Sequence, residues 1–170
     1  MDKYKELFDR LTALLDSNPA EAVKQVKEID LSRPIDEFYN LQVVRASILV
    51  DGGALTQQQD AIEDGITLFR ELYNKFPTAF LAYNLANGLA AAIGSPPRDD
   101  SWLDHMESSR ERRAEARKYY WEVTQDKKAD VKLQTQAWTN LANLFSSSRR
   151  FGEAPDRKST RLNSSHQLRS

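Results

Sequence analysis

The chain contains no cysteine, and its 170 residues include only two histidines. The absence of cysteine excludes a disulfide framework and thiol chemistry. No apolar run approaches the roughly 20 residues that a membrane-spanning helix needs. Residues 1–6 also lack the apolar centre of a signal peptide. We therefore expect no membrane partner and a cytoplasmic location.

Residue patterns that could support catalysis or metal binding are sparse. His105 has no second histidine or cysteine to act with, so a solvated side chain is favoured over a general base or metal ligand. Asp99, Asp100 and Asp104 lack the spacing of a calcium-binding loop, and a solvated loop is favoured there as well. We expect no metal, no cofactor and no enzymatic activity in this chain.

The C-terminal tail stands apart from the rest of the sequence. Residues 156–166 read Asp-Arg-Lys-Ser-Thr-Arg-Leu-Asn-Ser-Ser-His. This string resembles the in-frame translation of a common short-read sequencing adapter, and the residues after it fit an index followed by more adapter. We interpret residues 155–170 as a non-native, disordered tail, with native sequence ending near Ala154. The alternative is a genuine basic, serine-rich linker.

Charge gives no sign of a nucleic-acid partner. The whole chain has a formal net charge of −1, with 24 basic and 25 acidic residues. Without residues 156–170, which hold four basic residues and one acidic residue, the remainder has 20 basic and 24 acidic residues, a net charge of −4. A mildly acidic domain offers no electrostatic attraction for nucleic acid.

Hydrophobic residues recur at helical spacing along most of the chain, which predicts helices with short breaks. Gly65 lies inside one predicted helix, where glycine costs about 1 kcal/mol relative to alanine. We interpret it as the site of a close helix crossing. The predicted helices cover about 4–15, 19–29, 35–50, 57–76, 80–93, 110–123 and 132–146.

Several breaks carry local signals for helix ends. Asn18 precedes a proline and is predicted to cap the second helix. Gly52 and Gly53 predict a helix stop, and no Lys-Ser or Lys-Thr follows them as it would in a phosphate-binding loop. Thr56 with Gln59 predicts a capping box that opens the next helix.

The tetrapeptide Asn-Leu-Ala-Asn occurs twice, at residues 84–87 and 140–143, with an aromatic residue shortly before each copy. A repeated helical unit is typical of arrays that serve as binding surfaces. Residues 137–154 resemble a tetratricopeptide repeat (TPR), and residues 62–77 and 82–89 resemble its second and first helices. The residues that carry the strongest match are Trp138, Leu141, Ala142, Phe145, Phe151 and Ala154.

The resemblance implies an all-α fold, a right-handed stack of antiparallel helix pairs that forms a TPR-like α-solenoid. Residues 1–33 would be an N-terminal helical hairpin or cap, and residues 34–154 would be TPR-like repeats with an insertion at 94–109. Because the last unit is cut where its second helix begins, an apolar side of the last helix would be partly uncovered. The residues expected on that side are Trp138, Leu141, Leu144 and Phe145.

The resemblance also implies a peptide- or protein-binding scaffold, with the ligand on the concave face lined by the first helix of each pair. Asn87 and Asn140 match asparagines of family members that clamp a peptide's terminal carboxylate, but Tyr83 stands where those members have a lysine. The alternative is the sensor or regulatory half of a larger enzyme, such as a nuclease. The candidate peptide-binding residues are Tyr83, Asn87, Ala90, Gln136, Thr139, Asn140, Asn143 and Ser146.

Two other stretches carry alternatives. A basic stretch beside aromatic residues at 110–121 can suggest nucleic-acid contact. Glutamates at positions 107, 111 and 115 offer these bases partners one helical turn away, so we favour a solvated helix face. Trp102, Leu103 and Met106 either form a docking knob for a partner or fold back onto the array.

Overall fold

The computed structural model describes residues 3–29, 39–94 and 102–150, with side chains for 5–29, 39–94 and 106–146. This part of the chain forms seven helices and no strand, which confirms the predicted all-α class. None of these helices combines the length and apolar character needed to cross a membrane. The helices are α1 (Lys3–Ser17), α2 (Pro19–Lys27), α3 (Tyr39–Thr56), α4 (Gln59–Lys75), α5 (Ala79–Ala91), α6 (Trp102–Gln125) and α7 (Val131–Arg150).

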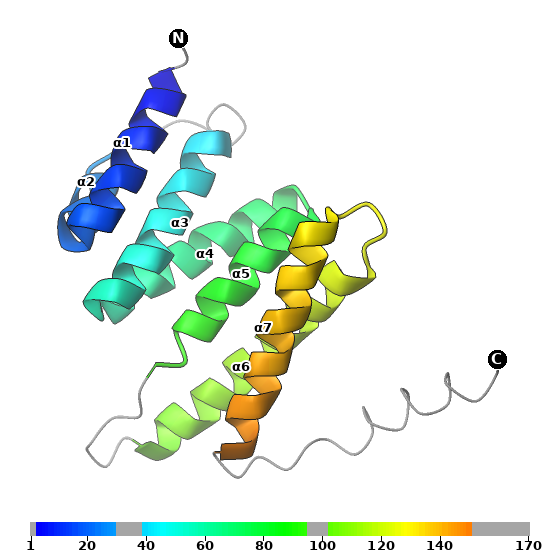
Figure 1. Ribbon diagram of the computed structural model, residues 1–170. Helices are drawn as coiled ribbons and strands as arrows, with labels where there is room; N and C mark the ends of the chain where they lie inside the picture. Colours follow the sequence, from blue (N-terminus) through cyan, green and yellow to red (C-terminus); the bar gives the residue numbers. More distant parts are fainter. Residues whose placement is uncertain (1–2, 30–38, 95–101, 151–170) are drawn as a thin grey trace, which may run out of the picture.

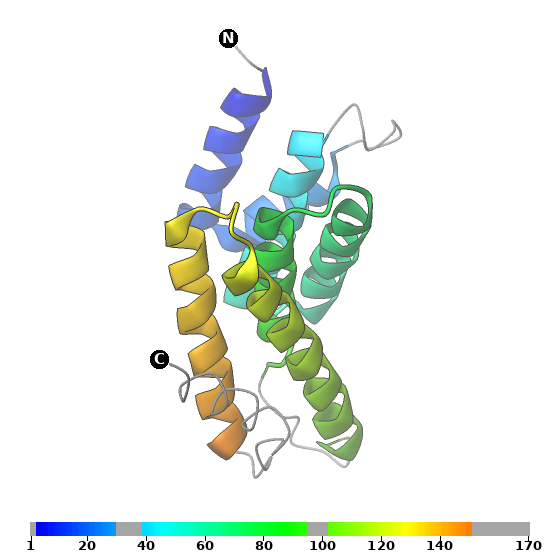
Figure 2. The same ribbon diagram turned by 90° about the vertical axis from the view of Figure 1, so that its right-hand side faces the viewer.

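Each helix packs against the next one along the chain, and the odd-numbered helices also contact one another in succession, α1 with α3, α3 with α5 and α5 with α7. Figure 1 shows these four helices side by side toward the viewer, with α4 and α6 behind them. The view turned by 90° places α4 and α6 on the opposite side from α1 and α7 (Figure 2). We call the solvent side of α1, α3, α5 and α7 the odd-helix face.

The predicted cap at Asn18 is present. Its side-chain oxygen accepts a hydrogen bond from the backbone N–H of Glu21 at 3.2 Å, and Pro19 occupies the first turn of α2. The same device begins α5, where the Thr78 hydroxyl oxygen accepts from the Leu81 N–H at 3.3 Å. Both caps satisfy backbone donors that the first turn of a helix leaves without partners.

The predicted helix stop at Gly52 and Gly53 is wrong, because α3 continues through both residues to Thr56. Both glycines are buried at contacts with other helices. A Cβ at Gly52 would lie 2.5 Å from a Val23 methyl group. The glycines therefore permit close packing within a helix and do not end it.

The capping box predicted at Thr56 is also wrong. The Thr56 hydroxyl donates to the carbonyl oxygen of Gly52 at 2.6 Å, one turn back in the same helix. The turn into α4 is made by Gln57, whose φ of 57° is in the left-handed region. Gln58 then precedes α4 without a side-chain cap.

The apolar interior consists of two groups of buried side chains. One joins α1, α2, α3 and α4, with Leu11, Val26 and Leu49 at its centre. The larger group joins α3 through α7 and includes Phe69 and Leu85, which are almost fully buried. α3 and α4 contribute to both groups, so burial of apolar surface is continuous from the first helix to the last.

Gly65 marks the close helix crossing predicted from the sequence. A Cβ placed there would lie 2.7 Å from Val50 Cγ2 and 2.9 Å from the carbonyl oxygen of Ala46, both on α3. The second contact is with backbone, which cannot move aside as a flexible side chain can. A larger residue at this position thus requires α3 and α4 to move apart.

The side of α7 that was predicted to be uncovered is only partly so. Trp138 and Phe145 are 48% and 43% exposed, as expected, and the expectation for Leu141 and Leu144 is wrong because they are 4% and 7% exposed. Leu141 and Leu144 pack into the larger core group. The helix therefore buries one stripe against α5 and α6 and leaves an aromatic stripe in solvent.

We predict that Gly65→Ala lowers the free energy of unfolding by about 1–3 kcal/mol, because overpacking outweighs the gain in helix propensity. Gly88→Ala is the matched control, since the nearest atom there is a side-chain carbon, Ile66 Cγ1, at 3.0 Å. Urea unfolding followed by circular dichroism measures both variants. A Gly65→Ala protein as stable as the Gly88→Ala protein would contradict the close crossing.

Candidate functional site: a tyrosine–asparagine cluster and an apolar hollow on the odd-helix face

Three of the predicted site residues meet in one hydrogen-bonded group. The Asn140 side-chain nitrogen on α7 donates to Asn87 Oδ1 at 3.1 Å and to the Tyr83 hydroxyl oxygen at 3.2 Å, both on α5. The Tyr120 hydroxyl on α6 donates to the same Asn87 oxygen at 2.6 Å. We call Tyr83, Asn87, Tyr120 and Asn140 the tyrosine–asparagine cluster, and it joins three helices.

The two copies of the repeated tetrapeptide supply different asparagines to this cluster. In both copies the leucine is buried, as Leu85 and Leu141, which turns the flanking asparagines toward the sides of the helix. On α5 the second asparagine, Asn87, faces the cluster, whereas on α7 the first one, Asn140, does so. Asn143, the sequence counterpart of Asn87, is exposed and makes no hydrogen bond to the described residues.

The cluster is partly removed from water. Tyr120 is 2% exposed, and burial raises the pKa of its hydroxyl, with a further contribution from Tyr83 and an opposing one from the Asn140 hydrogen bond. The Tyr83 and Tyr120 rings meet edge to face, with centroids 6.0 Å apart and an interplanar angle of 62°. The neutral phenol is therefore the form that the folded chain stabilises.

Three polar groups of the cluster keep hydrogen-bonding capacity. One is the Tyr83 hydroxyl, which accepts from Asn140 but donates to no described residue. Among the described residues, no hydrogen bond engages the side-chain nitrogen of Asn87, a donor, or the side-chain oxygen of Asn140, an acceptor. Both asparagines are half-buried on neighbouring helices. In an extended chain the N–H and C=O of one residue point to the same side, so the asparagine pair is complementary to one residue of a polypeptide main chain.

The remaining predicted site residues lie outside the tyrosine–asparagine cluster. Ala90 is half-buried on α5, and Gln136 is exposed on α7. Thr139 and Ser146 are exposed on α7, and each hydroxyl donates at 3.0 Å to a carbonyl oxygen of its own helix. With Asn143, these α7 residues form an exposed, uncharged stripe beside Asn140.

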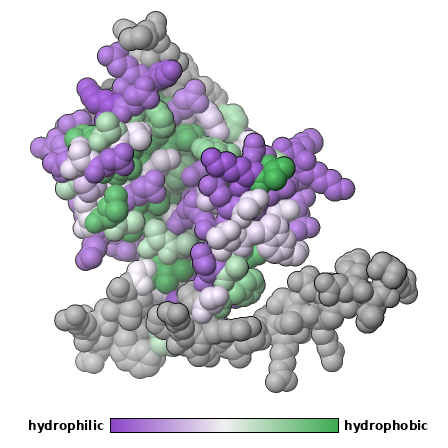
Figure 3. Space-filling model, viewed as in Figure 1, coloured by the Kyte–Doolittle hydropathy of each residue, from purple (hydrophilic) through white to green (hydrophobic). Residues whose placement is uncertain are grey.

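Sequence reasoning missed an apolar hollow on the same face. It has a volume of about 420 Å³ and lies between α1, α3 and α5. Figure 3 shows hydrophobic surface gathered over α3 and α5 in this view, bordered by hydrophilic surface. Phe8 and Phe80 border the hollow and are 45% and 47% exposed. The lining residues are Lys5, Leu7, Phe8, Tyr39, Asn40, Leu41, Val43, Val44 and Phe80.

A sequence signal could have found part of this hollow. Phe80 precedes Asn84 by four residues and Asn87 by seven, which is the spacing of one helix face. A phenylalanine on the same helix face as the first Asn-Leu-Ala-Asn copy therefore indicated the same surface. The other walls come from α1 and α3, and no local pattern links those helices to α5.

Charged residues are distributed unevenly between the helices. α5 (Ala79–Ala91) contains none, and α3 (Tyr39–Thr56) contains only Arg45 and Asp51. On α7, Lys132 is the only charged residue before the last two positions. By contrast, ten of the 24 residues of α6 are charged. The middle of the odd-helix face is thus built from helices with few charged residues or none.

The basic stretch of α6 is the predicted solvated face only in part, since Arg110 and Lys118 are exposed. Arg113 is 6% exposed, and Arg112 pairs with Glu63 of α4 at 2.6 Å. Glu115 pairs with Arg70 of α4 at 2.8 Å and not with a neighbour one turn away on α6. Sequence spacing suggested partners within the helix, whereas packing of α6 near α4 supplies closer ones.

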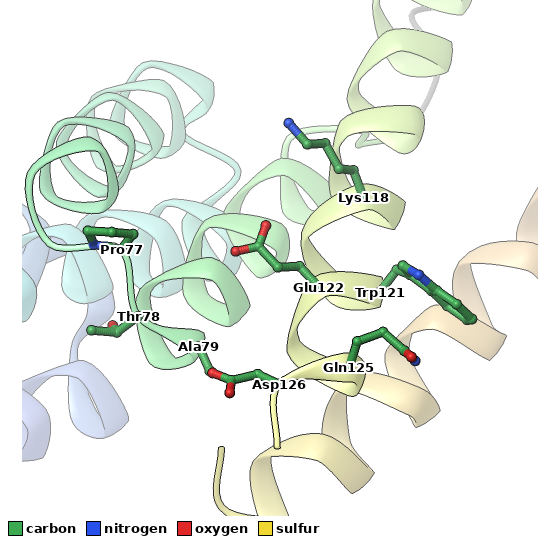
Figure 4. Close-up of a pocket in the computed structure, with 8 residues that line it drawn as sticks. All are labelled: Pro77, Thr78, Ala79, Lys118, Trp121, Glu122, Gln125 and Asp126. Carbon is green, nitrogen blue, oxygen red and sulfur yellow. The ribbon is translucent and has the colours of Figure 1, made fainter. Parts of the chain in front are cut away.

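A second hollow, of about 480 Å³, lies between the start of α5 and the second half of α6. In Figure 4, Glu122 points from α6 toward Pro77, Lys118 extends upward from α6, and the Trp121 ring turns away toward α7. Glu122 already accepts a hydrogen bond from the Tyr73 hydroxyl of α4. Most residues that line this hollow are polar or charged, in contrast to the apolar hollow between α1, α3 and α5.

Most of the other groups considered for chemistry or docking fall outside the described side chains. These are His105, the acidic residues at 99, 100 and 104, the knob residues Trp102 and Leu103, and the tail at 155–170. The predicted start of a helix around Arg110 is wrong, because α6 begins at Trp102. Within the described part, no three histidine, cysteine or acidic side chains gather as a metal site.

No family model, curated protein or solved structure matches the chain. The chemistry of the odd-helix face is consequently the guide to function.

We predict that Tyr120→Phe lowers the free energy of unfolding by about 0.5–1.5 kcal/mol at pH 7, the typical worth of one hydrogen bond. The folded-state pKa of Tyr120 is raised, so its stabilising effect is complete below the ordinary tyrosine pKa of about 10 and is lost as the pH rises further. The difference between wild type and variant should therefore shrink above pH 10. Chemical unfolding at pH 7 and pH 10.5 measures this, and a difference that does not change with pH would contradict it.

Proposed function

We propose that this chain is a TPR-like α-solenoid, a right-handed stack of antiparallel helix pairs that binds an extended peptide and performs no catalysis. The ligand lies on the odd-helix face, across α3, α5 and α7. The observation that carries the proposal is the free donor of Asn87 beside the free acceptor of Asn140, on an uncharged surface next to an apolar hollow.

The helix contacts support the stack. Each odd-numbered helix packs on the even-numbered helix that follows it, and successive odd-numbered helices touch, which is the arrangement expected when helix pairs repeat along an axis. Small residues at the crossings, such as Gly65 against Ala46, are consistent with the close approach that such pairs require.

The asparagine side chains support peptide capture. A peptide in extended form presents an N–H and a C=O at each residue, and binding through these groups needs paired donors and acceptors on the receptor. Asn87 and Asn140 supply such a pair at the cluster, and Asn143 with Gln136 adds exposed amides further out on α7. Because the cluster fixes both inner asparagines in place, little side-chain freedom is lost when a ligand binds.

Asn143→Ala tests the proposal without disturbing the fold. Because Asn143 is exposed and makes no hydrogen bond to the described residues, we predict unfolding free energy unchanged within about 0.5 kcal/mol. Affinity for peptides selected from a random 12-residue display library should fall roughly 3- to 10-fold, the equivalent of a lost hydrogen bond.

Asn74→Ala is the matched control, because Asn74 is an exposed asparagine on α4, outside the odd-helix face. Its peptide affinity should equal that of the wild type. Equal loss in both variants, or no loss in either, would contradict peptide binding on the odd-helix face.

A further inference from the structure

We infer that the peptide captured on this face is an uncharged segment that places one bulky apolar side chain in the hollow between α1, α3 and α5. This inference rests on the proposed function and names its ligand class. The juxtaposition that supports it is the apolar hollow and the cluster's free amide groups, joined by α5, which has no charged residue.

The charge distribution excludes a strongly ionic ligand. A carboxylate or ammonium group laid across α5 would lose water without gaining an opposite charge, since α5 has no charged residue at all. The charges on the neighbouring helices are of both signs: α3 has Arg45 and Asp51, α1 has three acidic and three basic residues, among them Lys5 at the hollow, and α7 has Lys132 near its start. Because the two signs are balanced, the surface as a whole favours neither acidic nor basic segments.

The uncharged surface also argues against capture of a terminal carboxylate. Stable binding of a carboxylate relies on lysine or arginine donors, or on several N–H groups converging on the anion. At the cluster the free donors are the Asn87 nitrogen and the Tyr83 hydroxyl, neither of which is charged, and the adjacent Asn140 oxygen repels an anion. One internal residue of an extended peptide engages both asparagines through its N–H and C=O, whereas a carboxylate has no donor for the Asn140 oxygen.

The hollow supplies the apolar part of the recognition. Phe8 and Phe80 are about half exposed and, with the apolar lining of the hollow, form a contiguous apolar patch, the kind of surface that marks an interaction site. The volume of about 420 Å³ falls in the range of ligand-binding pockets and admits an aromatic or large aliphatic side chain. Burial of such a side chain covers both rings and provides most of the binding free energy.

The positions of the hollow and of the cluster also determine the spacing between the two parts of the peptide that they bind. Phe80 and Asn87 are seven residues apart on one helix, which corresponds to about 10 Å at 1.5 Å per residue. An extended peptide advances about 3.3 Å per residue. The bulky apolar side chain of the ligand therefore lies at least about three residues from the residue whose C=O and N–H bind Asn87 and Asn140.

Display selection on the whole chain tests this inference. A library of random 12-residue peptides is selected, and the retained sequences are synthesised with amidated C-termini for titration calorimetry. We predict retained peptides without charged residues at the core of the motif and with one large apolar residue. We also expect affinity to change less than about twofold between 50 and 500 mM NaCl, since screening acts on charges alone.

Phe80→Ala, with Trp138→Ala as its matched control, tests whether the hollow binds the apolar side chain of the peptide. Both aromatic rings are about half exposed, at 47% and 48%, but Trp138 lies on the other side of α7, where its ring meets Trp121. We predict at least a tenfold loss of affinity for Phe80→Ala and less than a twofold change for Trp138→Ala. Circular dichroism establishes that each variant is folded.

The outcomes separate the two proposals. If retained peptides lose affinity with Asn143→Ala but are consistently acidic or basic, or need a free C-terminal carboxylate, the ligand class is wrong and peptide binding stands. If Phe80→Ala leaves their affinity unchanged, the hollow is not the anchor site. If no peptide is retained, or Asn143→Ala has no effect on those that are, both proposals are overturned.

Discussion

The hydrogen bonds around Asn87 are the interaction on which the odd-helix face depends. Its side-chain oxygen accepts from Tyr120 of α6 and from Asn140 of α7, so one acceptor fixes the positions of three helices. Apolar packing alone is tolerant of small slides between helices, whereas a shared acceptor specifies one register. The same bonds leave the side-chain nitrogen of Asn87 and the side-chain oxygen of Asn140 without partners among the described residues, and these are the groups that the proposed peptide would engage.

A second constraint is the position of α3 and α5 within the fold. α3 contacts α1, α2, α4 and α5, and α5 contacts α3, α4, α6 and α7. A helix covered on several sides loses the sites at which charged side chains can stay hydrated, which accounts for their apolar composition. It does not account for the lack of charge on their solvent side, where Phe80, Asn84 and Asn87 lie. An uncharged solvent side is what a surface that binds a polypeptide main chain would require.

The sequence predicted those features that local chemistry controls. The cap at Asn18 and the helix crossing at Gly65 follow from residue type and position, and the structure has both. The sequence-based prediction failed at Gly52 and Gly53. Glycine occurs both at helix ends and at close contacts between helices, and the local sequence does not distinguish these two roles. The prediction also placed the start of α6 too late, since proline and glycine near residue 95 were taken to disrupt a longer stretch than they do.

For the candidate site as well, the sequence predicted individual residues but not how they meet in the fold. The repeated tetrapeptide marked Asn87 and Asn140, and Tyr83 was also among the expected residues. That these side chains meet, with Tyr120 as the fourth member, depends on how α5, α6 and α7 are placed relative to one another. The hollow was missed for a related reason, because its walls come from three helices and only Phe80 is in register with the asparagines.

A double-mutant cycle on Asn87→Ala and Asn140→Ala measures the bond at the centre of this account most directly. Unfolding free energies of the wild type, both single variants and the double variant give the coupling between the two side chains. We predict a coupling of about 0.5–1.5 kcal/mol, and additivity within about 0.5 kcal/mol for the control pair Asn84→Ala and Asn143→Ala on the same helices. Additive effects of Asn87→Ala and Asn140→Ala would mean that the cluster does not join α5 to α7.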